Sequence, residues 1–205
     1  MRDEILAYKR ERILEEAVKL IYQRGFTATT LDDIAAELGV TKPFIYTHFR
    51  SKTDLLAALC TPTIELSLDA VTRAAKGPGL PRDRLYRAIV DFTQVVLSRQ
   101  ANIAIYFREE KHLSPNALNE INTLRKKFDR VLSKLLSEGI AAGEFDIKDV
   151  SLTALAIGGM ISWAYTWHRP EGRLALDDMC ERMADLALQM VGARSKVAAK
   201  LPASV

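Results

Sequence analysis

The chain has 205 residues, of which 48% are apolar and 27% are charged, and its formal net charge is +3. This composition is typical of a globular protein rather than a disordered one, and the length allows one domain or two small ones. The charged N-terminal stretch MRDEILAYKRER lacks the apolar centre of a signal peptide, and no apolar run reaches the roughly 18–20 residues of a membrane span. Cys60 and Cys180 fit no disulfide framework. These features predict a cytoplasmic protein that does not span a membrane.

The first fifty residues contain three helical segments in succession. Apolar residues recur at helical spacing in the first segment, and Gly25 is expected to end it. Thr30 can cap a second, short helix over residues 31–38, because Asp33 follows three positions later as in a capping box. Thr41 can cap a third helix over residues 42–49, which has Pro43 in its first turn, where a proline removes no needed hydrogen bond.

The rest of the chain is also predicted to be helical. Ser51 is expected to cap a long helix, and the stretch KGPGLPRD at residues 76–83 is the clearest break. Further helices are expected over about residues 83–98, 102–112, 115–143, 147–169 and 176–191. No segment alternates in the manner of a half-buried strand, and residues 193–205 are predicted to form a mobile tail. The sequence therefore predicts an all-α protein.

The second and third segments have the spacing of a helix-turn-helix. Ala35 is small where two short helices must cross closely, and Gly39 can take the left-handed conformation that the turn needs. Ile45 then returns a branched apolar side chain to the core, and Val40 and Phe49 complete the inner surface. The other faces of residues 42–49 are left for a partner.

DNA is the partner that this pattern indicates. The first 55 residues contain nine Lys or Arg and nine Asp or Glu, yet Lys42, Arg50 and Lys52 stand in a window of residues 41–52 that has no acid. A short helix with a donor-rich N-terminal end suits the DNA major groove. The predicted DNA-binding residues are Thr30, Thr41, Lys42, Pro43, Phe44, Tyr46, Thr47, His48 and Lys52.

Within this set, Lys42 and Thr47 would face base edges, whereas Tyr46, His48 and Lys52 would contact phosphates. The apolar side chains at positions 43 and 44 could contact a thymine methyl group. The alternative is that the aromatic residues are all core and that the charges only solvate the surface. The coincidence of the helix-turn-helix spacing with the acid-free window favours DNA.

The stretch GFTATTLDDIAAELGVTKPFIYTHFRSKTDLL, residues Gly25–Leu56, resembles the DNA-binding domain of the TetR family of bacterial repressors. The family pattern Tyr-x-His-Phe-x-x-Lys is present at positions 46–52. The resemblance implies a nine-helix, sequence-specific transcriptional repressor that a small molecule releases from operator DNA. It also implies a DNA-binding domain over residues 1–51 and a ligand-binding and dimerisation domain over residues 52–192. Phe44 departs from the family, which usually has a small residue there.

Aromatic residues are concentrated in the middle and later helices, with arginines close by in the sequence. Such a set is more often plain core than a binding site, but the arginines favour a pocket with an apolar body and a charged mouth. The predicted ligand-binding residues are Phe92, Tyr106, Arg108, Phe128, Trp163, Trp167 and Arg169. ANIAIYFREEKHL and SWAYTWHRPEGRL are similar to segments of TetR-type repressors of fatty-acid and sterol-ring breakdown, which implies an acyl-CoA effector.

The resemblance further implies a homodimer, formed when the last two helices of each subunit pair into a four-helix interface. Small residues in the helix after Asp146 would let another helix approach closely. The predicted interface residues are Gly158, Gly159, Met179, Met183, Leu186 and Met190. The alternative is that these residues pack within one chain. The helix that begins at Lys52 is expected to be the covalent link through which a ligand moves the DNA-binding domain.

Two other functions remain as alternatives. An enzyme is disfavoured, because the chain has no nucleophile elbow, no phosphate-binding glycine loop and no histidine pair at metal-ligand spacing. No catalytic residue, metal site or cofactor is therefore predicted. The second alternative is a DNA-binding protein of TetR fold that a protein partner controls and that has no small-molecule ligand.

Overall fold

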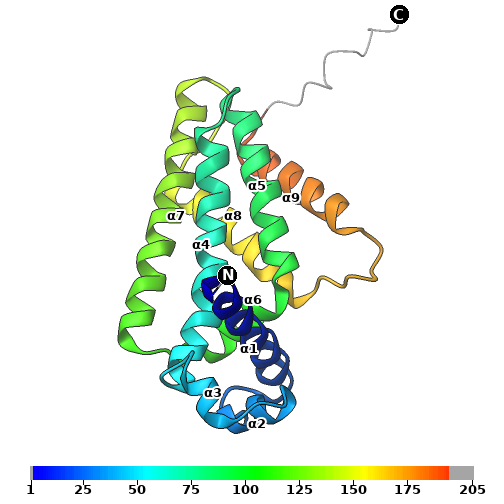
Figure 1. Ribbon diagram of the computed structural model, residues 1–205. Helices are drawn as coiled ribbons and strands as arrows, with labels where there is room; N and C mark the ends of the chain where they lie inside the picture. The colour runs from blue at the N-terminus through cyan, green and yellow to red at the C-terminus, as the bar shows by residue number, and fades with distance from the viewer. Residues whose placement is uncertain (1, 194–205) are drawn as a thin grey trace, which may run out of the picture. The chain divides into compact units, whose positions relative to one another are not determined.

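The computed structural model describes residues 2–193, and within that range the fold is all-helical (Figure 1). The α-helices are α1 (Arg2–Arg24), α2 (Leu31–Glu37), α3 (Lys42–Tyr46), α4 (Lys52–Lys76), α5 (Pro81–Ser98), α6 (Gln100–Glu109), α7 (Pro115–Ala141), α8 (Val150–Ser162) and α9 (Leu176–Met190). Two short 3-10 helices follow α6 and α8, at Glu110–His112 and Trp163–Thr166. The prediction of nine α-helices is confirmed for this part of the chain.

The described residues form two compact units, each with its own core. The first comprises residues 2–66 and 98–125, and the second comprises residues 67–97 and 126–193. The chain therefore passes between the units three times, within α4, at the end of α5 and within α7. The sequence predicts a covalent link through the helix that begins at Lys52, and α4 is one of these three passages. The predicted boundary at residues 51 and 52 stays a prediction.

Local sequence signals explain the turns of the first unit. Gly25 and Gly39 have φ of 84° and 64°, and a glycine adopts such left-handed conformations without steric strain. Thr30 caps α2 through a capping box in which its Oγ1 accepts from the Asp33 N–H at 3.1 Å. The Asp33 carboxylate in turn accepts from the Thr30 N–H at 2.7 Å. The predicted helix end at Gly25, the predicted left-handed turn at Gly39 and the predicted capping box are confirmed.

The third helix is shorter than residues 42–49. Regular helix ends at Tyr46, and the N–H groups of His48 and Phe49 then both donate to the Ile45 carbonyl at 3.0 Å. This tightened turn still directs Ile45 and Phe49 into the core, where they are 0% and 1% exposed. Thr41 is the N-cap residue, but its side chain forms no capping hydrogen bond. The start of α3 therefore depends on Pro43 and on the turn before it.

The second unit is built on α5 and the C-terminal part of α7. Phe92 of α5 and Phe128 of α7 are buried, and their ring centroids lie 4.7 Å apart. A Cβ atom at Gly139 would lie 1.9 Å from the Phe145 ring, so this position requires glycine for close packing. Asp149 caps α8 by accepting from the Leu152 N–H at 2.9 Å. The predicted tail, residues 193–205, lies outside the described residues apart from Ala193.

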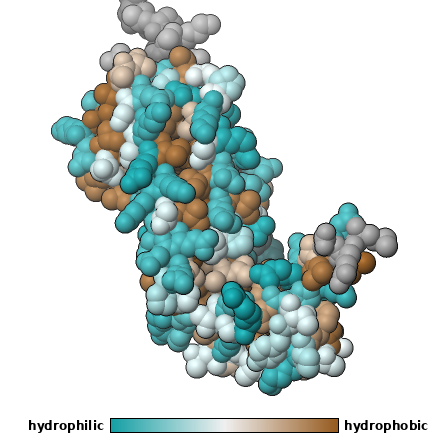
Figure 2. Space-filling view, turned by 60° about the vertical axis from the view of Figure 1, so that its left-hand side comes forward, coloured by the Kyte–Doolittle hydropathy of each residue, from teal (hydrophilic) through white to brown (hydrophobic). Residues whose placement is uncertain are grey.

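The helices turn polar stripes to solvent, as amphipathic helices do. The face of the molecule in Figure 2 shows polar residues (teal) interspersed with apolar ones (brown). Among residues 2–193, α4 is the one helix long and apolar enough, by length and composition, to cross a membrane. In its most apolar window 44% of the residues are buried, which is also typical of a core helix in a soluble protein.

Candidate DNA-binding and effector sites

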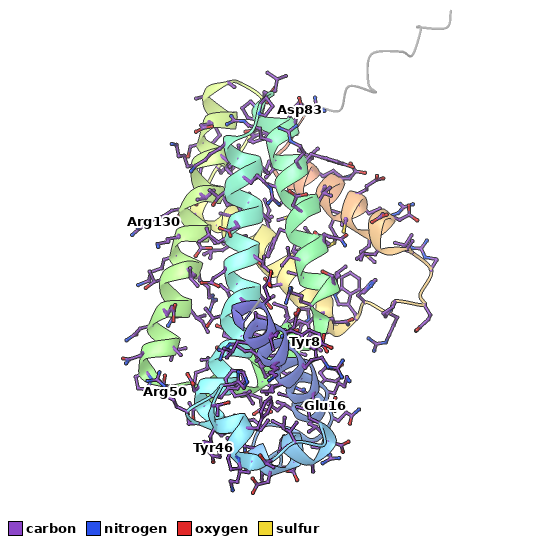
Figure 3. All side chains as sticks on the ribbon, viewed as in Figure 1. Tyr8, Glu16, Tyr46, Arg50, Asp83 and Arg130 are labelled. Atoms are coloured by element: carbon purple, nitrogen blue, oxygen red, sulfur yellow. The ribbon has the colours of Figure 1, made fainter. Side chains whose placement is uncertain are left out.

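The face of α3 that is predicted to contact DNA points to solvent, as the sequence predicts. Lys42, Pro43 and Thr47 are exposed, and Tyr46 has an exposed fraction of 47%. Figure 3 labels Tyr46, the last residue of α3, near the bottom of the view, and Arg50 above it. These side chains stand away from the core that Ile45 enters, so they are available to a partner. Their contacts with DNA stay a prediction.

An acid does approach this face in space, although residues 41–52 contain none. The Lys42 ammonium donates to the Asp32 carboxylate of α2 at 2.8 Å, and this hydrogen bond and charge raise the lysine pKa. Both side chains are more than half exposed, so the pair is screened by water and contributes little to stability. Lys42 can therefore exchange Asp32 for a base or a phosphate without a large penalty. Sequence reasoning missed this partner because it counted acids only along the chain.

Phe44 is half-buried and packs against the core of the first unit. Its ring lies edge-on to His48, with centroids 5.2 Å apart, and the Lys9 ammonium is 5.6 Å from its centroid. Only part of the ring is therefore free to touch a base. This explains how a large residue is accommodated where the family usually has a small one. Its predicted contact with a thymine methyl is compatible with this packing, and it stays a prediction.

Side chains from the end of α6 and from the 3-10 helix after it contact the end of α1 and the segment that leads into α2. Arg108 donates to the Tyr22 carbonyl at 3.1 Å and lies 5.1 Å from the Tyr22 ring centroid. Glu109 accepts from the Phe26 N–H at 3.3 Å, and the His112 ring stacks on the Phe26 ring at 5.0 Å. We call Arg108, Glu109 and His112 the α6 contact cluster. It lies wholly within the first unit.

Lys52 contacts the same segment from the start of α4. Its ammonium is 4.3 Å from the Phe26 ring centroid and donates to the Thr27 carbonyl at 3.3 Å. Burial lowers the pKa of Lys52, and the carboxylates of Asp33 and Glu109 partly offset this by raising it. Lys52, which is predicted to bind a phosphate, therefore contacts the same aromatic residue, Phe26, as the α6 contact cluster. This shared contact connects α6 to the predicted DNA-binding surface within the first unit.

Replacing Lys52 by Ala is expected to weaken binding to all DNA sequences about equally. One cation per subunit is lost, so the slope of log affinity against log salt should fall by roughly one per subunit. Filter-binding titrations at several salt concentrations measure both quantities. Tyr46→Phe is the companion variant, and loss of one hydrogen bond should weaken binding by about 1 kcal/mol with little change in slope. An unchanged slope for Lys52→Ala would show that its ammonium stays on Phe26 in the complex.

The predicted ligand-binding residues are divided between the two units. Tyr106 is 2% exposed in the core of the first unit, where its hydroxyl accepts from Arg125 at 3.2 Å. Arg108, also in the first unit, donates to the Tyr22 carbonyl. In the second unit, Phe92 and Phe128 form a buried pair, whereas Trp163 and Trp167 are exposed. Arg169, also in the second unit, is exposed and donates to the His168 carbonyl at 3.1 Å.

A groove in the second unit does not explain an effector site. It measures about 180 Å³ and is lined by Thr72, Ala75, Lys76, Val131, Lys134, Leu135 and Glu138. None of the predicted ligand-binding residues belongs to it. Drug-sized ligands usually occupy pockets of roughly 300–1,000 Å³, so this groove is small for an acyl-CoA. The predicted ligand residues therefore stay predictions.

Apolar side chains form an exposed face on α8 and α9, which contact each other. On α8 and the turn after it, Leu152, Leu155 and Trp163 are exposed by 64%, 58% and 59%, and they share one helical stripe with Gly159. On α9, Leu186 and Met190 are 45% and 40% exposed. We call these six residues the α8/α9 apolar face. The sequence predicts three of them, Gly159, Leu186 and Met190, as interface residues and Trp163 as a ligand-binding residue, and these assignments stay predictions.

The remaining predicted interface residues are less accessible. Gly158 faces inward, because a Cβ atom there would lie 3.9 Å from the Phe128 ring, whereas one at Gly159 would meet no atom within 4 Å. Met183 is 3% exposed and Met179 is intermediate. The exposed half of the predicted set is thus concentrated on the α8/α9 apolar face.

Among residues 2–193, no group of three or more His, Cys, Asp or Glu side chains could hold a metal ion.

Comparisons with known proteins identify the kind of protein to which these surfaces belong. The family model "Bacterial regulatory proteins, tetR family" matches residues 13–59, and "Tetracyclin repressor-like, C-terminal domain" matches residues 78–191. The two matches cover the helix-turn-helix and most of the later helices.

Individual relatives agree with these family matches. The transcriptional repressor KstR2 of Rhodococcus jostii is 28% identical over 187 residues, covering 88% of this chain and 89% of KstR2. The crystal structure of the regulator PfmR from Thermus thermophilus superposes with a TM-score of 0.81, at 29% identity, covering 87% of this chain and 97% of PfmR. AibR, solved in complex with isovaleryl coenzyme A and operator DNA, gives 0.73 at 27% identity, covering 89% and 97%. The chain therefore belongs to the TetR family of DNA-binding transcriptional regulators, which are not enzymes.

Proposed function

We propose that this regulator is a repressor that an amphiphilic acyl thioester, such as an acyl-CoA, releases from its operator. The observation that carries the proposal is the similarity to AibR, whose structure contains both isovaleryl coenzyme A and operator DNA. The similarity to the repressor KstR2 favours repression over activation. Repression would take place in the cytoplasm, where the DNA of a bacterial cell lies.

The buried pair Phe92 and Phe128 is the proposed site for the acyl group. Its rings are apolar, and Gly158 of α8 leaves room beside Phe128 that a larger residue would fill. Aromatic walls with few polar groups suit a hydrocarbon or ring system. Arg169 is the proposed partner of the nucleotide phosphates, because its guanidinium is exposed and uses only one of its two ends on nearby carbonyls. Arg108 is less suited to that role, since it is held by Tyr22.

The α6 contact cluster is the proposed route from effector to DNA. α6 begins two residues after α5, which carries Phe92, and ends on the segment that enters the helix-turn-helix. A change in α6 would therefore act on Phe26, on which Lys52 also rests. A differential affinity of about 1–3 kcal/mol is sufficient, because it changes DNA affinity by roughly 5–150-fold.

A homodimer is the proposed working form. One helix-turn-helix reads only a few base pairs, and a twofold pair places two recognition helices about one DNA turn apart, roughly 34–36 Å, or somewhat more. The α8/α9 apolar face is the surface proposed to close the dimer. Its aliphatic and aromatic side chains are exposed in the single chain and would be buried between two copies.

The effector proposal is tested by titrating the protein with acyl-CoAs of different chain length and with a cyclic acyl-CoA. Calorimetry gives the affinity of each, and an operator selected from random-sequence DNA gives the effect on DNA binding. We expect at least one thioester to bind in the micromolar range and to weaken operator binding, whereas free coenzyme A does neither. Operator binding without any response to the thioesters would favour the second candidate, control by a protein partner.

A further inference from the structure

We propose that Lys9 and Arg10 of α1, together with His48, form an additional phosphate-binding site at the edge of the operator interface. We call these three residues the α1 basic patch. The inference rests on the operator binding assigned above and is independent of the identity of the effector. None of the sequence motifs points to α1, which lies outside the helix-turn-helix.

Contacts within the first unit bring α1 to the end of the recognition helix. Arg10 donates from Nη1 to the His48 carbonyl at 2.7 Å, and its guanidinium lies 4.1 Å from the Phe49 ring centroid. Lys9 is 5.6 Å from the Phe44 ring, which in turn contacts the His48 ring edge at 5.2 Å. Two cations from consecutive positions of α1 therefore lie close enough to His48 to act on its charge. Residues 38 positions apart in the sequence thus share one surface.

Positive charge is concentrated around His48. The pKa of His48 is lowered by burial first, and then by the positive charges of Arg10 and Lys9. Lys9 and Arg10 are both exposed, so their remaining donors face water. A guanidinium carries five N–H donors, and a lysine ammonium carries three, so the patch keeps several donors for a ligand. An anion bound beside two exposed cations is attracted by both and offsets the repulsion between them.

The neighbouring residues identify that anion as a DNA phosphate. His48 belongs to the motif that matches the family's DNA-binding domain, and it follows directly after the exposed face of Tyr46 and Thr47. A helix in the major groove has a phosphate backbone on either side of it. Figure 3 labels Tyr8, the residue before Lys9, on α1 and Tyr46 at the end of α3. Both side chains are exposed. The α1 basic patch extends the contact surface beyond α3 on the side of His48.

The test compares Lys9→Gln with Lys19→Gln by salt-dependent operator binding. The two variants lose the same charge from the same helix, but Lys19 is 61% exposed and paired with Glu16 at 3.0 Å. We expect Lys9→Gln to lower the salt slope by roughly one per subunit and to weaken binding several-fold more in dilute salt than in concentrated salt. Lys19→Gln should behave as wild type. Equal slopes for Lys9→Gln and wild type would overturn the inference.

A second variant separates the charge from the packing of Arg10. Arg10→Lys keeps the cation but loses the planar group that stacks on Phe49, whereas Arg10→Gln loses the charge as well. If the patch binds phosphate, Arg10→Gln should lower the salt slope and Arg10→Lys should not, even where both melt at a lower temperature. If Arg10 only supports the fold, both variants should keep the wild-type slope. Wild-type binding, titrated first on the same DNA, tests the operator-binding assignment separately.

Discussion

Leu155→Asp is expected to convert the proposed dimer into monomers and to abolish tight operator binding. Leu155 is 58% exposed in the single chain, so the change should leave the fold of the subunit intact. Full burial of a leucine contributes about 1.5–3 kcal/mol, and a twofold interface would lose this contribution twice. A loss of about 3 kcal/mol corresponds to a more than 100-fold higher dissociation constant. Light scattering at micromolar concentration measures the oligomeric state.

Leu80→Asp is the matched control. Leu80 is 50% exposed but lies in the loop before α5, outside the α8/α9 apolar face, so its variant should remain a dimer. If both aspartate variants remain dimers that bind the operator, a different surface must join the subunits. Circular dichroism should show the same helix content for wild type and both variants.

Gly159→Leu provides a sharper version of the same test. A Cβ atom there would meet no atom within 4 Å in its own subunit, so the replacement starts from open space and adds bulk to the outer surface. Removing glycine from a helix interior should raise the melting temperature of the monomer slightly, because glycine in that position costs roughly 0.5–1 kcal/mol relative to alanine. The dimer should weaken through steric exclusion. A weaker dimer together with an unchanged or more stable subunit would separate the interface from the fold.

The sequence predicted the features that depend on residues close together in the chain. The capping box of Thr30 and Asp33 and the left-handed Gly39 are set by three to five neighbouring positions, and both are confirmed. The inward direction of Ile45 and Phe49 also follows from local spacing. These features were sufficient to place the helix-turn-helix and the family.

Features that depend on distant residues could not be predicted in this way. Lys42 meets Asp32 because two helices cross, and Glu109 meets the Phe26 N–H across 83 positions of the chain. The exposed leucines of α8 were missed for a different reason. That helix is apolar on nearly every side, so its periodicity does not reveal which face is covered within the subunit. Only the burial of the opposite face of α8 shows which leucines are left outside.

Glu109→Ala is expected to uncouple effector binding from DNA binding. The Glu109 side chain is 13% exposed and accepts the Phe26 N–H, so its loss leaves that donor without its partner next to the helix-turn-helix. An unsatisfied, largely buried donor costs about 1–3 kcal/mol, which is comparable to the whole coupling free energy expected for a regulator of this kind. The segment around Phe26 should therefore no longer follow α6 when the effector binds.

The measurement is the affinity for the proposed acyl-CoA effector with and without saturating operator. Coupling is reciprocal, so in wild type the operator should weaken effector binding by the same factor by which the effector weakens operator binding. For Glu109→Ala this factor should fall towards one, while the effector still binds the free protein. Glu109→Gln keeps an oxygen that can accept from Phe26, so it should retain most of the coupling. Glu120→Ala, an exposed glutamate of α7 in the same unit, should retain all of it.

The pattern across the three variants decides between two mechanisms. If the route runs through the α6 contact cluster, the loss of coupling should follow the loss of the acceptor at position 109 rather than the loss of charge. If α4 alone carries the signal, Glu109→Ala should keep the wild-type factor, because Lys52 would still connect α4 to Phe26. If the wild-type protein binds the effector tightly and its coupling factor is one, the inducer mechanism is wrong. The assignment of DNA binding would still stand. The Glu109 carboxylate oxygen that accepts from the Phe26 N–H is therefore the atom on which the proposed regulation depends.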